Sequence, residues 1–494
     1  MIENKTNSNL IKLALMIVIT LCIHVLTLVK SSVVAAAFGT SESVDAYNFA
    51  NSIVTFVFGI VISGISTIII PEYSNKRERK IVDSFITVIY GATLIITAMM
   101  VLLRYPLINL LSNKGEAFTS IAANCLVILM ISQYLSAVSG ITTAYFQCEN
   151  KHNVPKVVNL LCQLLVIAVL LCVQDRMSIL EYALIISAGY MLGFVADTAV
   201  ALKSGWRFSP ALRLDSDSKA VLLRFVPIIF SGGVYRLSLL IDSLIASTLS
   251  TGMITILNYS IQISNIVSSV IVGNLLLYIY PRITREVSQS GSQERFWEQA
   301  LGLHAIVCLM IAGYVCVGEE AVMFLLNRGR FSAEACKIVF YASALYITGQ
   351  GISIIRDMVY RYFYAIGNTK APAGNSVLVS VCNITISLIL VKLIGFYGII
   401  LGTLAASVIS LTVIMIKFHK FVGFSGRLPA IIRDFAKNFA VMLVTIVLVC
   451  GTKQLFNIDS NLLGILVFGM ETVIAYILIQ GVCNKNVLAG IRKL

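Results

Sequence analysis

Ionisable side chains lie inside long apolar stretches of this chain, where each needs a partner or a water-filled cavity. Lys30 is the only basic residue deep in the first apolar stretch, and residues 31–38 separate it from the next polar loop. A lysine at a membrane helix centre costs roughly 2.5–3.5 kcal/mol, so it either snorkels to the interface or neutralises an anion in a cavity. His24 lies six residues earlier, about 240° around a helix, and therefore on another face. It is a candidate cavity residue or a hydrogen-bonded interior histidine.

Acidic residues in the apolar stretches point to cation or helix-end chemistry. Asp45 begins the second stretch, where it either complements a helix dipole or acts as a gate or cavity partner of Lys30. Arg236 and Asp242 share a later stretch, but their six-residue spacing places them on different faces, so each needs a partner elsewhere. Intramembrane carboxylates commonly mark ion and proton pathways. Asp242 is therefore a candidate for a coupling cation or proton.

A third group of charges falls within one stretch near residue 360. Asp357 and Arg361 are four residues apart and can form a structural ion pair on one helix face. Arg356 is then left over, and it either faces a cavity or snorkels along neighbouring helices. Asp197 and Glu471 are further intramembrane acids without an evident partner, and we assign them no role.

The stretches that carry these residues identify a polytopic membrane protein. The chain of 494 residues is 58% hydrophobic and only 12% charged, whereas soluble domains carry about 25% charged residues. A helix needs about 20 apolar residues to cross a bilayer, and runs of this length without strict alternation cannot be barrel strands. We predict fourteen helical spans: 12–38, 46–71, 82–103, 118–147, 155–174, 179–202, 222–249, 254–281, 297–326, 334–366, 374–393, 397–418, 432–452 and 462–483.

The distribution of basic residues predicts the orientation. With the N-terminus in the cytoplasm, 25 of the 37 Lys and Arg residues fall in cytoplasmic segments, 8 fall in outer loops, and 4 lie within spans. This bias favours a multi-pass protein of the bacterial cytoplasmic membrane with both termini inside. The net charge of +13 is then a property of loops on one membrane face rather than a sign of nucleic-acid binding. The 11 Cys residues show no CxxC or Cys/His spacing, which argues against a metal site or disulfides.

An internal repeat divides the chain into two parallel halves. Residues 38–71 and 249–281 both read as a short polar loop, a long apolar helix and a terminal proline. Tyr145-Phe146 and Tyr362-Phe363 each lie ten residues before a proline. The predicted organisation is an N-terminal lobe of six spans at 1–210, a C-terminal lobe of six spans at 211–425, and two extra helices with a cytoplasmic tail at 426–494. Parallel halves are a transporter architecture, with the substrate held between them.

Several motifs resemble the MurJ/MviN family of lipid II flippases, within the superfamily of polysaccharide flippases and MATE exporters. They occur in the family's order over about residues 20–420: FGTSESVDAY at 38–47, PEY at 71–73, Tyr145-Phe146 with NVP at 153–155, Asp242 with Ala246-Ser247, LNY at 257–259, NRGRFSAEA at 327–335 and RYFYAIGNTKAP at 361–372. The resemblance implies fourteen helices, two lobes of six, a central cavity open to one side at a time, and a lipid substrate carrying a pyrophosphate and sugars.

The chain departs from the family where cavity arginines are expected. The first-helix arginine positions hold His24 and Lys30, the span 2 position falls at the apolar Val57-Phe58, and the span 8 position holds Gln262. The family's acidic residue early in span 2 is retained as Asp45. Arg236 and Arg356 could supply positive charge from other helices. We therefore predict a substrate-binding cavity formed by Lys30, His24, Asp45, Arg236, Gln262 and Arg356.

The same resemblance suggests a coupling-ion site. Some family members bind sodium between spans 7, 11 and 12, where this chain has Asp242 and Asn383, with Ser387 in place of a second acid. We treat these three residues as a candidate Na⁺ or H⁺ coupling site. No other cofactor is implied, and the absence of a Walker motif indicates that the chain itself does not use ATP.

These features predict a flippase rather than an enzyme. It would move an undecaprenyl-pyrophosphate-linked glycan, lipid II or a related cell-envelope intermediate, from the inner to the outer leaflet by alternating access. An exporter of exopolysaccharide or teichoic-type repeat units and a MATE-like cation or drug antiporter remain alternatives. A glycan polymerase or ligase would need a large outer loop, but the longest here is about 104–117. The expected partners are the lipid-linked glycan, membrane lipid and envelope-synthesis enzymes.

Overall fold

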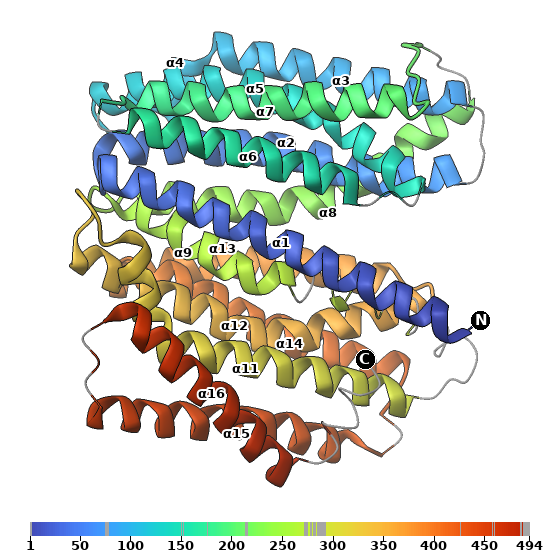
Figure 1. The fold of residues 1–494 in the computed structure, drawn as a ribbon. Coiled ribbons are helices and arrows are strands. Elements are labelled where there is room, and N and C mark those ends of the chain that lie inside the picture. The colour runs from blue at the N-terminus through green and yellow to red at the C-terminus, as the bar shows by residue number, and fades with distance from the viewer. Residues whose placement is uncertain are drawn as a thin grey trace. The chain divides into compact units, whose positions relative to one another are not determined.

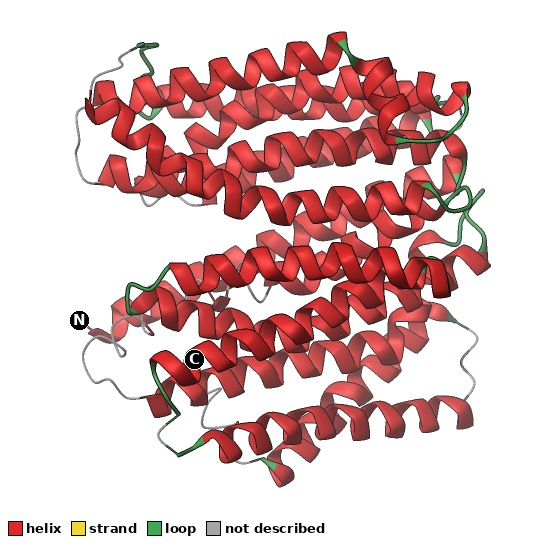
Figure 2. Ribbon diagram, turned by 180° about the vertical axis from the view of Figure 1, so that it is seen from behind, coloured by secondary structure: helices red, strands yellow, loops and turns green. Residues whose placement is uncertain are grey.

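The computed structural model describes residues 2–74, 79–149, 153–174, 176–212, 216–270, 293–424, 426–456 and 460–484, with a few single positions between these ranges. Every regular element in the described parts is a helix, as Figure 2 shows. The predicted all-helical fold class is therefore confirmed. Helices suit such apolar segments because they satisfy all their backbone polar groups internally.

The described helices divide into two compact units, residues 18–255 and residues 1–17 with 256–494. The first unit contains α2 to α8 and most of α1 (Figure 1). The bounds of these helices are α1 Ile2–Phe38, α2 Glu42–Ser74, α3 Arg79–Leu102, α4 Arg104–Leu111, α5 Glu116–Cys148, α6 Asn153–Val173, α7 Ile179–Lys203 and α8 Ser216–Ser247. Within this unit α2 packs against α5 and α8, and α7 packs against α5 and α6.

The second unit is arranged around α11, which packs against α12, α15 and α16. Its helices are α9 Met253–Val270, which begins at the end of the first unit, α11 Gln293–Leu326, α12 Ala333–Ala365, α13 Lys370–Ile394, α14 Tyr397–Phe421, α15 Leu428–Leu455 and α16 Asn461–Cys483. α13 and α14 form a close pair, because a Cβ at Gly402 would lie 2.8 Å from the backbone nitrogen of Ser387. Small residues permit this kind of approach between membrane helices.

Twelve helices in the described parts are long and apolar enough to span a membrane. They coincide with twelve of the fourteen predicted spans, and the chain is an all-helical multi-pass membrane protein. The other two predicted spans, 222–249 and 254–281, fall on α8 and α9, and the second of them extends beyond the described residues. Helix ends follow local sequence signals: Ser178 and Glu181 form a capping box at α7, and Ser332 caps α12.

Candidate functional site

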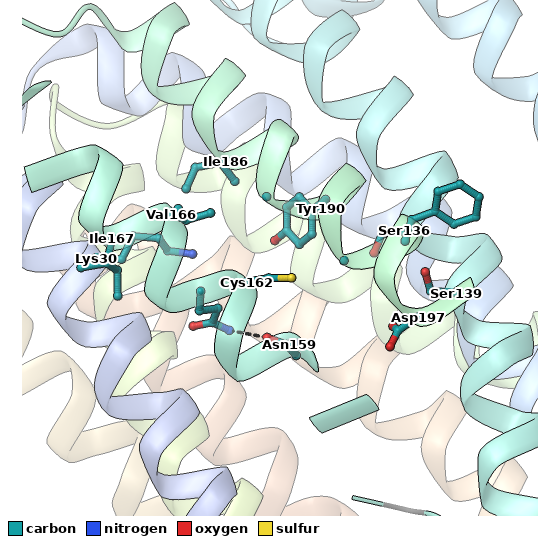
Figure 3. Close-up of a pocket in the computed structure, with 14 residues that line it drawn as sticks. Lys30, Ser136, Ser139, Asn159, Cys162, Val166, Ile167, Ile186, Tyr190 and Asp197 are labelled. Carbon is teal, nitrogen blue, oxygen red and sulfur yellow. Dashed lines mark hydrogen bonds between the residues drawn. The ribbon is translucent and has the colours of Figure 1, made fainter. Parts of the chain in front are cut away.

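A cavity of about 240 Å³ lies inside the first unit, between α1, α5, α6 and α7. Its wall on α6 and α7 consists of residues at helical spacing, so one face of each helix is turned toward the same space. The lining residues are Lys30, Ser136, Ser139, Asn159, Cys162, Gln163, Val166, Ile167, Ile186, Gly189, Tyr190, Gly193, Phe194 and Asp197. Figure 3 shows ten of these labelled side chains around the cavity. Both polar and apolar groups therefore face it.

Lys30 occupies one end of this cavity, in the view of Figure 3 opposite Asp197. The side chain is half-buried, and among the described residues it forms no hydrogen bond or ion pair. An ammonium group removed from bulk water and lacking a protein partner is favourable only if a ligand or bound water compensates its charge. This end of the cavity is therefore suited to an anionic group.

Amide side chains of α6 form the polar wall beside Lys30. The Gln163 amide nitrogen donates to the Asn159 side-chain oxygen at 2.8 Å, and the Thr27 hydroxyl donates to the Gln163 oxygen at 3.4 Å. The second bond ties α1, which carries Lys30, to α6. Sequence reasoning missed these residues, although Asn159 and Gln163 stand one turn apart on the α6 face that also carries Cys162. That spacing of polar residues in an apolar helix was the available signal.

Small residues keep the cavity open on α7. A Cβ at Gly193 would meet no atom within 4 Å, so this glycine borders open space. A Cβ at Gly189, one turn earlier, would collide with the Val166 side chain of α6. Gly189 therefore permits close packing of α6 on α7, while Gly193 leaves room in the cavity itself.

Asp45 is buried and binds the first turn of α9. Its Oδ2 accepts a hydrogen bond from the Gly252 backbone N–H at 2.6 Å, and its Oδ1 accepts bonds from the Thr255 N–H and hydroxyl at 2.9 and 2.6 Å. A carboxylate at a helix N-terminus satisfies free N–H groups and complements the helix dipole. Asp45 thus plays the dipole role that we considered, but on a helix 207 residues away rather than on its own.

Arg236 lies across α2 at Gly59. A Cβ at residue 59 would be 2.9 Å from the guanidinium carbon of Arg236, so this guanidinium occupies the space beside the glycine. Gly59 directly follows Val57-Phe58, the apolar position where the resemblance leads us to expect an arginine. Arg236 of α8 therefore brings a guanidinium group to this part of α2. Asp242, on the same helix, is buried with 1% of its surface exposed.

The prediction that Arg356 is left over when Asp357 pairs with Arg361 is wrong. The Arg356 Nη2 atom lies 2.9 Å from Asp357 Oδ1, and its Nε donates to the same oxygen at 3.0 Å. The arginine also lies over the Tyr360 ring, 5.7 Å from its centroid. Adjacent residues can pair in this way because the long arginine side chain can bend back to the carboxylate, a geometry that the four-residue rule ignores. The cavity role of Arg356 stays a prediction.

The other predicted site residues lie in the second unit or away from the cavity. Asn383 accepts hydrogen bonds from Ser387 at 3.2 Å and from Thr403 at 3.0 Å, so these side chains join α13 to α14. Gln262 is half-buried on α9, and His24 is half-buried on α1 and is not among the residues that line the cavity. Because Asp242 belongs to the first unit and Asn383 and Ser387 to the second, their joint cation site stays a prediction.

Comparison with known proteins identifies the family to which these features correspond. The family model described as lipid II flippase MurJ matches residues 34–468. A probable lipid II flippase MurJ from Synechocystis sp. is 25% identical over 443 residues, covering 83% of this chain and 82% of the relative. The lipid II flippase MurJ of Burkholderia cenocepacia is 23% identical over 409 residues, covering 78% of each chain.

Solved structures show the same fold. A lipid II flippase MurJ in an inward closed conformation superposes with a TM-score of 0.80 at 18% identity, covering 95% of this chain and 99% of that structure. An inward-facing multidrug resistance MATE family transporter of the MOP superfamily gives a TM-score of 0.63 at 13% identity, covering 82% of this chain and 98% of that structure. The fold is thus shared with both structures, and it matches the flippase more closely than the exporter.

Proposed function

The chain belongs to the lipid II flippase MurJ family, which confirms the resemblance, and we propose that it moves lipid II from the inner to the outer leaflet. The family comprises transporters rather than a class of catalytic enzymes. We infer that this member likewise acts by translocation and catalyses no covalent step. The substrate is a lipid-linked glycan with a pyrophosphate, and the chain carries it by alternating access in the bacterial cytoplasmic membrane.

The observation that carries the proposal is the position of Lys30. Its ammonium group faces a cavity inside the membrane-spanning part, without a hydrogen bond or ion pair to any described residue. A pyrophosphate offers the negative charge that such a group needs, and charge-assisted bonds to phosphate oxygens are about twice as strong as neutral ones. The neighbouring amides of Asn159 and Gln163 and the hydroxyl of Tyr190 can bind sugar or phosphate oxygens.

Arg236, also in the first unit, supports the proposal that the substrate path carries positive charge. Its guanidinium lies against Gly59, beside the apolar segment where an arginine is expected from the family resemblance. Arginine is well suited to phosphate because its planar fork presents paired donors. We propose that Lys30 and Arg236 together supply the positive charge of the substrate path. His24, Arg356, Asp45 and Gln262 remain candidates for lining that path.

The test is complementation of a bacterium whose own lipid II flippase is depleted. We expect this chain to restore growth and to prevent the accumulation of lipid II on the inner leaflet. Restoration should fail with a chain that carries Lys30→Ala, although the variant is present in the membrane at the normal level. Continued accumulation of lipid II in cells that contain the inserted wild-type chain would contradict the proposal.

The orientation belongs to the same proposal and has its own test. We propose that both termini are cytoplasmic, because basic residues are concentrated in the segments on that side. In a variant without native cysteines, a cysteine at Ser43 or Ser332 should react with an impermeant thiol reagent in intact cells. A cysteine at Ser216 should react only after the cells are opened. Labelling at Ser216 in intact cells would reverse the orientation.

A further inference from the structure

The cavity has a second polar end, away from Lys30, for which neither the family match nor the proposed function gives a role. Asp197 of α7 and Ser139 of α5 both line it, with Ser136 one turn from Ser139. In Figure 3 these three side chains lie on the side of the cavity opposite Lys30. Asp197 Oδ1 and Ser139 Oγ are buried, and neither has a hydrogen-bond partner among the described residues.

Two buried oxygens at this end of the cavity have no hydrogen-bond partner among the described residues. Buried polar atoms are almost always hydrogen-bonded, so each exception calls for a ligand, an ion or a water. An ionised carboxylate in this position is favourable only if a cation compensates it. Carboxylate, hydroxyl and amide oxygens are the ligands that hard cations prefer. Asp197 is the one acidic residue among the described residues that line the cavity, so a single negative charge is available and a monovalent ion suits it.

We propose that this end of the cavity is a Na⁺ site in which Asp197 supplies the charge and Ser139 and Ser136 supply neutral oxygens. It is distinct from the predicted ion site at Asp242, because the residues belong to α5 and α7 rather than α8, α13 and α14. Asp197 stands on the same α7 face as Gly193, one turn earlier, whose lack of a side chain leaves space on that face. The ion would therefore share a cavity with the anion-binding end at Lys30.

This arrangement couples the two ends electrostatically. A Na⁺ at Asp197 and the ammonium of Lys30 repel each other through a medium of low effective dielectric constant. When an anion neutralises Lys30, the repulsion falls and the Na⁺ site binds more tightly. By reciprocity, Na⁺ must strengthen binding of the anion by the same factor. This step rests on the proposed function, whereas Na⁺ binding itself does not.

The experiment measures binding of ²²Na⁺ to the purified full-length protein in nanodiscs, with no lipid-linked glycan present. An Asp242→Asn background removes the predicted second ion site, so that one site is observed. We expect saturable Na⁺ binding that K⁺ and choline do not match. Asp197→Asn should abolish it, and Ser139→Ala, which keeps the charge, should weaken it about tenfold, the effect of losing one ligand contact. Glu471→Gln is the control, because this intramembrane acid accepts a bond from Thr452 in the other unit.

The Lys30→Gln variant tests whether the two ends of the cavity are electrostatically coupled. Removing the cation at the opposite end should tighten Na⁺ binding several-fold while leaving the protein folded. No saturable Na⁺ binding in the Asp242→Asn protein, or binding unchanged by both Asp197→Asn and Ser139→Ala, would overturn the proposal. Binding of a proton alone at Asp197, with no competition by Na⁺, would overturn it too. None of these outcomes affects complementation by the wild-type chain, so failure here is distinct from failure of the flippase assignment.

Discussion

Charged side chains are partnered differently at the cavity of the first unit and at two ion pairs of the second unit. In the first unit Lys30 and Asp197 face a shared cavity and form no ion pair with any described residue. In the second unit charges are closely paired: Lys453 lies 2.5 Å from Glu320, and Arg356 lies 2.9 Å from Asp357. A buried group whose bonds are made by its neighbours stabilises a fold, whereas one that faces empty space is available to a ligand.

In the second unit, buried polar side chains around Asn438 are hydrogen-bonded to one another. The side-chain oxygen of Asn438 accepts bonds from Gln480 at 2.7 Å and Asn484 at 3.2 Å, and its nitrogen donates to the Leu301 carbonyl at 3.2 Å. The buried His304 ring lies 3.3 Å from the same nitrogen. These bonds join α15 and α16 to α11. Polar bonds between membrane helices stabilise their packing, so this network is structural.

The largest expected effect is at Lys30. Lys30→Gln should reduce flipping roughly 30-fold or more, because loss of a charged partner costs 2 kcal/mol or more of anion binding. Lys30→Arg should retain much of the activity, since it keeps the charge. The measurement is lipid II accumulation in depleted cells that carry each variant. Full activity of Lys30→Gln would show that Lys30 does not bind the anionic group. Arg236 would then be the next candidate for that role.

Asn438→Ala should damage stability instead of substrate binding. We expect the free energy of unfolding to fall by about 2–4 kcal/mol, because several buried partners lose their bonds at once. Thermal denaturation of the purified protein measures this change. The matched control is Asn461→Ala, an exposed asparagine in the same unit, which should change stability by no more than about 0.5 kcal/mol. If the two substitutions lower the free energy of unfolding equally, the network does not stabilise the fold.

The two glycines of α7 test the shape of the cavity. Gly189→Ala should destabilise the protein by about 1–3 kcal/mol, because the added methyl group collides with Val166. Gly193→Ala adds the same group to open space and should leave stability unchanged or slightly improved. The two melting temperatures are compared in one detergent. The reverse order would show that Gly193 rather than Gly189 contacts a neighbouring helix.

The smallest effect is expected at Asp45. Asp45→Asn removes the charge and one acceptor from the first turn of α9, and loss of a helix cap costs about 0.5–2 kcal/mol. Glu42→Gln is the control, since Glu42 also lies in the first turn of α2 but is exposed. The melting temperature of the Glu42→Gln protein should match that of the wild type. A neutral effect of Asp45→Asn beside this control would show that the bonds to Gly252 and Thr255 do not contribute to the fold.

Much of the fold could be predicted from the sequence because apolar length alone identifies membrane helices. The family motifs were equally accessible, since residues such as Asp45-Ala46-Tyr47 are contiguous. The candidate site was harder. The partner of Asp45 is 207 residues away, and the cavity takes Lys30, Asn159 and Asp197 from three helices. No local spacing rule brings such residues together, which is why Asp197 had no assigned role. Asp357 was paired with Arg361 rather than with Arg356 because the four-residue rule ignores adjacent residues.

The most direct test of the contrast between the units is the stabilisation of purified protein by lipid II. The wild type should gain about 2.7 kcal/mol of stability at a lipid II concentration 100 times the dissociation constant. Lys30→Gln should unfold at the same temperature as the wild type without lipid, and it should gain little when lipid II is added. If Lys30→Gln is as strongly stabilised by lipid II as the wild type, or if it already unfolds at a much lower temperature without lipid, Lys30 is not held free for the substrate and the account is wrong.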